Sequence, residues 1–156
     1  MNKIPPMYSD NHSMTPCGCT AVLVTNQFEC ERLIRAGRAI ANDAQTDLCV
    51  INVENNEYPT NPEAIQHLFN VSSENGAVMH LMYSENSFKT ICEYLKTNRT
   101  AAVVTGMPSS GHSILHRIWK KFPSVQFFTV NRENKVEEVL DRKSHMEAPI
   151  PAGLRS

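Results

Sequence analysis

The sequence predicts an α/β fold, a five-stranded parallel sheet in a doubly wound three-layer α/β/α sandwich of the Rossmann-like kind. Short apolar segments rich in β-branched residues alternate with segments whose apolar side chains recur at helical spacing. Because strands alternate with helices, we expect parallel strands joined by right-handed crossovers. The strands are apolar almost throughout, which is typical of a sheet covered by helices on both faces.

Each predicted strand is a run of mainly apolar residues between polar or glycine-containing segments. The five predicted strands are residues 20–25, 47–53, 77–83, 100–105 and 125–130. Helical spacing predicts a helix over 28–44 and further helices around 88–95 and 115–122. Another helix is expected to begin at Asn61, a good capping residue that Pro62 follows, and to end at Gly76.

The chain has 156 residues, which suits one domain with a substantial core. Residues 1–18 are polar, rich in proline and without periodicity, so we expect a flexible N-terminal arm. The α/β domain is expected over 19–131. Residues 132–156 are expected to form a C-terminal tail, with a short helix around 135–142 and disorder beyond it.

The composition excludes several classes of partner. The net charge of −1 gives no general attraction to nucleic acid or to an anionic membrane. No apolar run is long enough to span a bilayer, and the N-terminus lacks a signal core, so we expect a cytoplasmic protein.

The five cysteines are an odd number without scaffold-like spacing, so we expect reduced thiols, and Cys17 with Cys19 is interpreted as an incidental pair.

Candidate site residues follow the first, second and fourth predicted strands, because ligands of doubly wound sheets bind beyond the carboxyl ends of the strands. They are Thr25, Asn26, Val53, Gly106, Ser109, Ser110, Gly111, His112 and Ser113. Small residues, hydroxyl groups and the start of a helix suit the segment 106–113 to an anion. The alternative is that Ser110 or Ser113 caps the helix and Gly111 relieves a tight turn.

The string GMPSSGHS at 106–113 differs by one residue from the phosphate-binding pattern G-x-x-x-x-G-K-[ST]. His112 replaces the lysine, and a mostly neutral imidazole is a poor substitute for a permanent cation. Ser113 could ligate magnesium, but no aspartate ends a neighbouring strand, and Glu54 is a weak substitute. A P-loop NTPase is therefore the least favoured function. Since no nucleophile and base are brought together by the predicted topology, we expect no enzyme.

The five β/α units and the loop that begins with glycine after the fourth strand resemble the universal stress protein family. Residues 31–41 resemble the first helix of the stress-protein-like domain in sensor kinases of the KdpD type. Residues 103–130 resemble the last loop, helix and strand of that domain. The resemblance covers about residues 20–131 and implies the same five-stranded fold.

The ATP-binding branch of that family has the pattern G-x-x-G, nine residues, then G-[ST]. Gly106 matches its first glycine, whereas Ser109 stands at the second and Trp119-Lys120 replaces the final pair. Asn26 stands where this branch has an aspartate. The resemblance implies a non-catalytic stress or signalling module that binds a nucleotide or phosphate ligand through a degenerate motif. ATP, AMP and cyclic di-AMP are the candidate ligands, and Phe128-Thr129-Val130 resembles a segment of the family's cyclic di-AMP binders.

The alternative function is a ligand-free homodimeric interaction module. Members of the family often dimerise through the last strand, here residues 125–130, so we expect a homodimer through that strand. His112 and His116 have metal-ligand spacing on one helix, but two ligands do not make a site. We expect no metal, and we expect His116 and Lys120 to point toward solvent.

Overall fold

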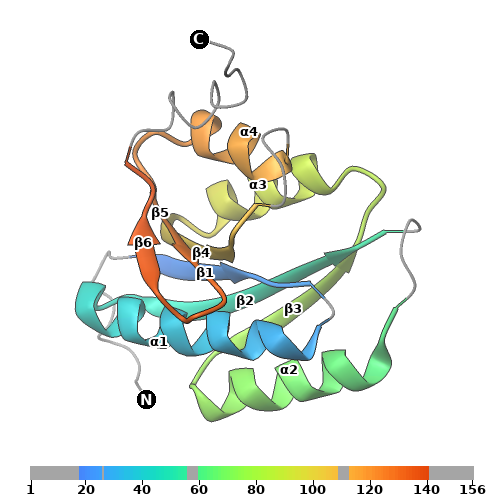
Figure 1. Cartoon of the computed structure of the whole chain (residues 1–156). Helices are drawn as coiled ribbons and strands as arrows, with labels where there is room; N and C mark the ends of the chain where they lie inside the picture. Colours follow the sequence, from blue (N-terminus) through green and yellow to red (C-terminus); the bar gives the residue numbers. More distant parts are fainter. Residues whose placement is uncertain (1–17, 26, 56–59, 109–112, 141–156) are drawn as a thin grey trace, which may run out of the picture.

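The computed structural model describes residues 18–25, 27–55, 60–108 and 113–140. One mixed sheet forms the middle layer, with α1 and α2 on one face and α3 and α4 on the other (Figure 1). The predicted three-layer α/β fold is therefore confirmed, with one strand more than expected. None of the helices in these described ranges is both long and apolar enough to cross a membrane.

The elements follow the predicted order closely. The strands are β1 (Cys19–Leu23), β2 (Asp47–Glu54), β3 (Val78–Tyr83), β4 (Thr100–Gly106), β5 (Gln126–Val130) and β6 (Val136–Glu138). The helices are α1 (Glu31–Ala44), which the 3₁₀ turn η1 (Phe28–Cys30) precedes, α2 (Pro62–Glu74), α3 (Ser87–Thr97) and α4 (Ile114–Lys121). The expected cap of α2 is present, since Asn61 Oδ1 accepts a hydrogen bond from the Ala64 N–H at 3.2 Å.

The strand order is β3-β2-β1-β4-β5-β6. The first five strands are parallel, and β1 pairs with both β2 and β4. From β1 the chain proceeds outward through β2 to β3, and it then crosses back to lay β4 on the other side of β1. The order of the strands therefore reverses beside β1, which is where ligands of such sheets bind.

Two apolar clusters fill the spaces between the layers. The cluster beneath α1 and α2 is built around fully buried side chains such as Val22, Ile34 and Leu68. The cluster beneath α3 and α4 contains Trp119 and Phe127, each 1% exposed. Because β1, β2 and β4 lie inside the sheet and helices cover both of its faces, most of their residues are apolar, which explains the apolar runs in their sequence.

The prediction of a short helix around 135–142 is wrong over residues 135–140, the part that the structure describes, because these residues contain β6 instead. β6 is antiparallel to β5, with Val130 opposite Val136. The reversal is local: Asn131 Oδ1 accepts hydrogen bonds from the backbone N–H groups of Glu133 and Lys135, both at 2.9 Å. Asn134 has a φ of 67°, a left-handed conformation that asparagine tolerates well. This turn returns the chain along β5.

The added strand changes which strand lies at the edge of the sheet. β5 was expected at the edge, where it could pair with a second copy of the chain. In the structure β6 occupies that edge of β5. A homodimer stays a prediction, but strand-to-strand pairing at this side of the sheet would have to use β6.

Gly37 gives a direct test of the contact between α1 and the sheet. A Cβ at this position would lie 2.5 Å from Val22 Cγ2 and 3.2 Å from Leu48 Cδ1. We expect Gly37→Ala to lower the free energy of unfolding by about 1–3 kcal/mol in urea denaturation, because overpacking outweighs the better helix propensity of alanine. Asp43→Ala, at an exposed position of the same helix, is the control and should not destabilise. Equal stability of Gly37→Ala and the wild type would contradict this close packing.

Candidate functional site

A cavity of about 1110 Å³, the larger of two that are described below, lies at the carboxyl ends of β1, β2 and β4. The starts of α2, α3 and α4 complete its wall through Pro62, Ser87 and Ile114. Apolar side chains, including Leu23, Ile91 and Leu115, supply much of the lining. The cavity is therefore at the predicted edge of the sheet, and its size is ample for a small organic ligand.

A buried carboxylate is the main polar feature of this cavity. Glu54 ends β2 and is 6% exposed. Its Oε2 accepts a hydrogen bond from Asn52 Nδ2 at 2.7 Å, and its Oε1 accepts one from Thr60 Oγ1 at 3.3 Å. Thr60 precedes α2, whose N-terminal end carries a partial positive charge that favours a nearby anion. The carboxylate is thus held in place by groups from both β2 and the segment before α2.

The charge of the larger cavity differs from what a phosphate site requires. Glu54 is its one charged lining residue within the ranges that the structure describes, and that charge is negative. A carboxylate accepts hydrogen bonds and donates none. Because a buried acceptor is best matched by a donor, this cavity suits hydroxyl, amino or cationic groups of a ligand.

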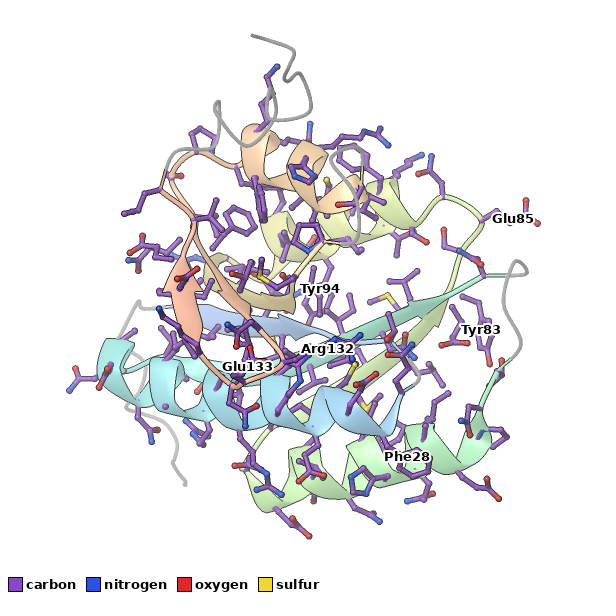
Figure 2. The ribbon with its side chains drawn as sticks, in the orientation of Figure 1. Phe28, Tyr83, Glu85, Tyr94, Arg132 and Glu133 are labelled. Carbon is purple, nitrogen blue, oxygen red and sulfur yellow. The ribbon has the colours of Figure 1, made fainter. Side chains whose placement is uncertain are left out.

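A second cavity of about 260 Å³ lies on the other side of the β1 end. It shares Thr25 and Gln27 with the larger cavity, and its lining includes Glu29, Arg32 and Arg132. Figure 2 shows Arg132 beside Glu133 at the turn between β5 and β6. Both guanidinium groups belong to this smaller cavity, so the two cavities have contrasting electrostatic character.

Arg32 has a structural role in the smaller cavity. Its guanidinium Nη1 donates hydrogen bonds to the carbonyl oxygens of Val130 and Asn131, each at 2.9 Å. These carbonyls end β5 and begin the turn to β6. Arg32 thereby ties α1 to the last parallel strand at the edge of the sheet where both cavities open.

The structure brings three of the predicted site residues to this edge. Thr25 lines both cavities, Val53 lines the larger one and Gly106 the smaller one. A Cβ at Gly106 would meet no atom within 4 Å, so its backbone has open space beside it. Five further candidates lie outside the described residues, namely Asn26, Ser109, Ser110, Gly111 and His112.

Ser113 occupies the capping position of α4, as the alternative interpretation of the loop expected. Its side chain makes no capping hydrogen bond. Instead, Ser113 Oγ lies 3.2 Å from Nδ1 of His116. Ser113 is not among the lining residues of either cavity, whereas the next residue, Ile114, lines the larger one.

The expectation that His116 points toward solvent is wrong. His116 is 4% exposed, and its ring packs edge-on against Trp119 with the centroids 4.8 Å apart. The prediction took Leu115 as the centre of the buried face, whereas α4 buries His116, Ile118 and Trp119. The buried face of α4 is therefore turned about the helix axis by about one residue from the face that was expected. Lys120 is exposed as expected.

The sequence interpretation missed the group around Glu54. It considered Glu54 only as a weak metal ligand and did not select Asn52, Thr60 or Thr105, which also line the larger cavity. A signal was present, because Asn52 and Glu54 interrupt an apolar strand at alternate positions and so share one face. No cluster of three or more metal-ligating side chains occurs in the part of the chain that the structure describes.

No protein-family model and no curated protein matches this chain in sequence. Solved structures do match its fold. A universal stress protein family member from Burkholderia pseudomallei superposes with a TM-score of 0.53 at 12% identity, covering 73% of this chain and 96% of that one. A universal stress protein from Archaeoglobus fulgidus gives a TM-score of 0.53 at 16% identity, covering 73% and 92%.

This chain has the universal stress protein fold. The predicted resemblance is confirmed at the level of architecture, because both matched structures are aligned over nearly their whole length. The finer likeness to the KdpD-type domain stays a prediction. The fold supports many different ligands on one scaffold, so the function has to be argued from the groups at the site.

The variants Arg32→Ala and Arg35→Ala together test how much the hydrogen bonds of Arg32 at the smaller cavity contribute to stability. Arg32→Ala leaves two strand-end carbonyls without their donor, and we expect it to lower the free energy of unfolding by about 1–3 kcal/mol. Arg35 pairs with Glu31 at 2.8 Å on the helix surface, and Arg35→Ala should cost less than about 1 kcal/mol. Chemical denaturation of both variants gives the comparison. Equal losses would contradict the anchoring role of Arg32.

Proposed function

We propose that this protein is a non-catalytic nucleotide-binding module of a stress or signalling pathway, with the nucleoside part of its ligand in the larger cavity. The observation that carries this proposal is the buried Glu54 carboxylate, held by Asn52 and Thr60 where the strand order reverses. Polar groups that converge in a largely apolar pocket are what a small-molecule site requires.

The chemistry of the lining suits a nucleoside. A nucleoside combines a flat apolar base with hydroxyl and amino donors. The apolar side chains of Leu23, Ile91 and Leu115 would pack against the base, while Glu54 would accept hydrogen bonds from ribose hydroxyl or base amino groups. A hydrogen bond to an ionised acceptor is about twice as strong as a neutral one, so Glu54 is the group expected to contribute most to affinity.

The phosphate groups would lie on the other side of the β1 end. The two cavities share Thr25 and Gln27, so a ligand with its base in the larger cavity can extend past these residues. There it would approach Gly106 and the guanidinium of Arg132. The contribution of Ser109, Ser110, Gly111 and His112 stays a prediction. ATP, AMP and cyclic di-AMP remain the candidate ligands, and no catalytic step is proposed for any of them.

Calorimetric titration with adenosine and AMP tests the assignment of Glu54. We expect Glu54→Gln to weaken both ligands by roughly 10- to 100-fold, because a charge-assisted hydrogen bond becomes a neutral one. Glu63→Gln, which removes an exposed carboxylate from the first turn of α2, is the matched control and should leave affinity unchanged.

Inorganic phosphate serves as a second probe in the same titrations. Its affinity should not fall in Glu54→Gln, since it lacks the nucleoside part. Equal affinities of the wild type and Glu54→Gln for adenosine would contradict the assignment. Failure of adenosine, AMP, ATP and cyclic di-AMP to bind at millimolar concentration would contradict the proposed function.

The alternative proposal is a ligand-free homodimeric interaction module. The observation that favours it is the pair of exposed apolar side chains at the β6 edge, Val136 at 40% and Leu140 at 78% exposed. Glu137 and Glu138 lie beside them, and such charges usually keep a sheet edge from pairing.

Light scattering at two protein concentrations tests this alternative. A dimer through the β6 edge should dissociate in the double variant Val136→Lys, Leu140→Lys, because two like charges would be added at the contact. Val78→Lys, at the opposite edge on β3, is the matched control and should leave the dimer intact. A wild-type chain that is monomeric at both concentrations would exclude this function.

A further inference from the structure

A pair of thiols lies at the amino-terminal end of β1 and β2, away from both cavities. Cys19 begins β1, and Cys49 is on β2 opposite Ala21. Because side chains alternate along a strand, Cys19 and Cys49 share one face of the sheet. Their sulfur atoms lie 2.7 Å apart. Both residues belong to the core beneath α3 and α4 and are 8% and 9% exposed, respectively.

Two buried hydroxyl groups flank this pair. Thr100 is opposite Cys19 on β4, and its Oγ1 has no hydrogen-bond partner of good geometry. The Tyr94 hydroxyl from α3 also lacks such a partner and interacts with the Cys49 thiol. Figure 2 shows Tyr94 on the α3 side of the sheet. Burying an unpartnered hydroxyl is costly, and both of these groups adjoin the two sulfur atoms.

The surroundings make the two thiols unequal. The hydrogen bond from Cys19 holds the pKa of Cys49 below its usual range. The Tyr94 hydroxyl also lowers this pKa, whereas burial raises it. The interaction with Cys49, followed by burial, raises the pKa of Cys19. Of the two thiols, Cys49 is therefore the one that loses its proton more readily. Reactivity toward oxidants belongs to the thiolate form.

We propose that Cys19 and Cys49 form a peroxide-reactive dithiol site that closes to a disulfide. The placement of the two sulfur atoms on adjacent strands carries this proposal. A disulfide needs an S–S distance of about 2.05 Å, and the present separation exceeds it by well under 1 Å, so small side-chain rotations suffice. The site is independent of the nucleotide cavity and of the proposed function.

The reaction balances with hydrogen peroxide as the oxidant. The Cys49 thiolate attacks one peroxide oxygen, the O–O bond breaks, and the departing hydroxide takes up a proton to leave as water. This step leaves a sulfenic acid on Cys49. Cys19 Sγ then attacks that sulfur, the S–S bond forms, the S–O bond breaks, and the hydroxyl leaves as water with the Cys19 proton. The two thiols lose two electrons, and one peroxide gives two waters.

Thiol counting by mass spectrometry tests the proposal on the full chain. The native protein is treated with a small excess of hydrogen peroxide, denatured and alkylated. The reduced chain has five cysteines, so we expect alkylation to fall from five groups to three. Cleavage after Glu29 separates Cys30 from Cys19, and the linked peptides should then join Cys19 to Cys49.

Single variants assign the linkage. Cys17→Ser, Cys30→Ser and Cys92→Ser should still lose two thiols, because none of them removes a member of the pair. Cys49→Ser should lose none. Cys19→Ser should stop at the sulfenic acid on Cys49, which a dimedone adduct detects. Because Cys17 and Cys19 lie in the same peptide, the Cys17→Ser variant also shows which of these two cysteines is linked to Cys49.

Several results would overturn the proposal. Five alkylated thiols after treatment of the wild type would do so, and so would a Cys17–Cys19 linkage or a Cys19–Cys49 linkage found only in the denatured protein. Peptide mapping of the wild type decides the question even where a variant fails to fold. If the Cys19→Ser variant has a native circular dichroism spectrum but forms no dimedone adduct on Cys49 after peroxide treatment, the role of Cys49 is contradicted.

The pH dependence of the oxidation rate tests the influence of the Tyr94 hydroxyl on the Cys49 thiol. The other titratable groups at this cluster are Cys19, Asp47, which raises the pKa of both cysteines, and His80, whose ring contacts Tyr94 with centroids 5.4 Å apart. Tyr94→Phe removes a hydroxyl that lowers the pKa of Cys49. The midpoint of the rate profile should therefore move to higher pH, and an unchanged profile would contradict this influence.

Discussion

The pairing of β1 with both β2 and β4 is the constraint on which the rest of this structure depends. It puts the carboxyl ends of three parallel strands at one edge, and the chain leaves β1 toward β2 and returns on the other side at β4. Space therefore opens at the end of β1, with a cavity on either side of it. Glu54 and Asn52 reach the larger cavity because β2 extends beyond β1 at this edge. The polar groups are thus placed by the register of the sheet.

Most of the fold could be predicted from the sequence, because each element has a strong local signal. Apolar runs marked β1 to β5, and Asn61 with Pro62 marked the start of α2. β6 could not be predicted by periodicity, since the side-chain hydrogen bonds of Asn131 and the left-handed Asn134 decide the course of the chain there. His116 was misplaced because helical spacing gives the width of an apolar face more reliably than its centre.

The site was only partly predictable for a different reason. Topology alone indicated which strand ends to examine, so Thr25, Val53 and Gly106 were found. The importance of Glu54 depends on its hydrogen bond to Thr60, which belongs to the segment before α2 rather than to β2. The short distance between Cys19 and Cys49 likewise depends on the register of two strands that are separated by a whole helix. Contacts between distant parts of the chain leave little trace in local sequence patterns.

Amide chemical shifts measured by NMR during titration with adenosine decide whether the Glu54 cavity binds a nucleoside. We expect saturable shifts that cluster at the carboxyl ends of β1, β2 and β4, with the largest changes near Thr25, Asn52, Glu54 and Thr105. The amides of the opposite sheet end, around Cys19 and Cys49, should not move. A spectrum unchanged at millimolar adenosine, or shifts confined to the outer surfaces of the helices, would show that this cavity does not bind a nucleoside.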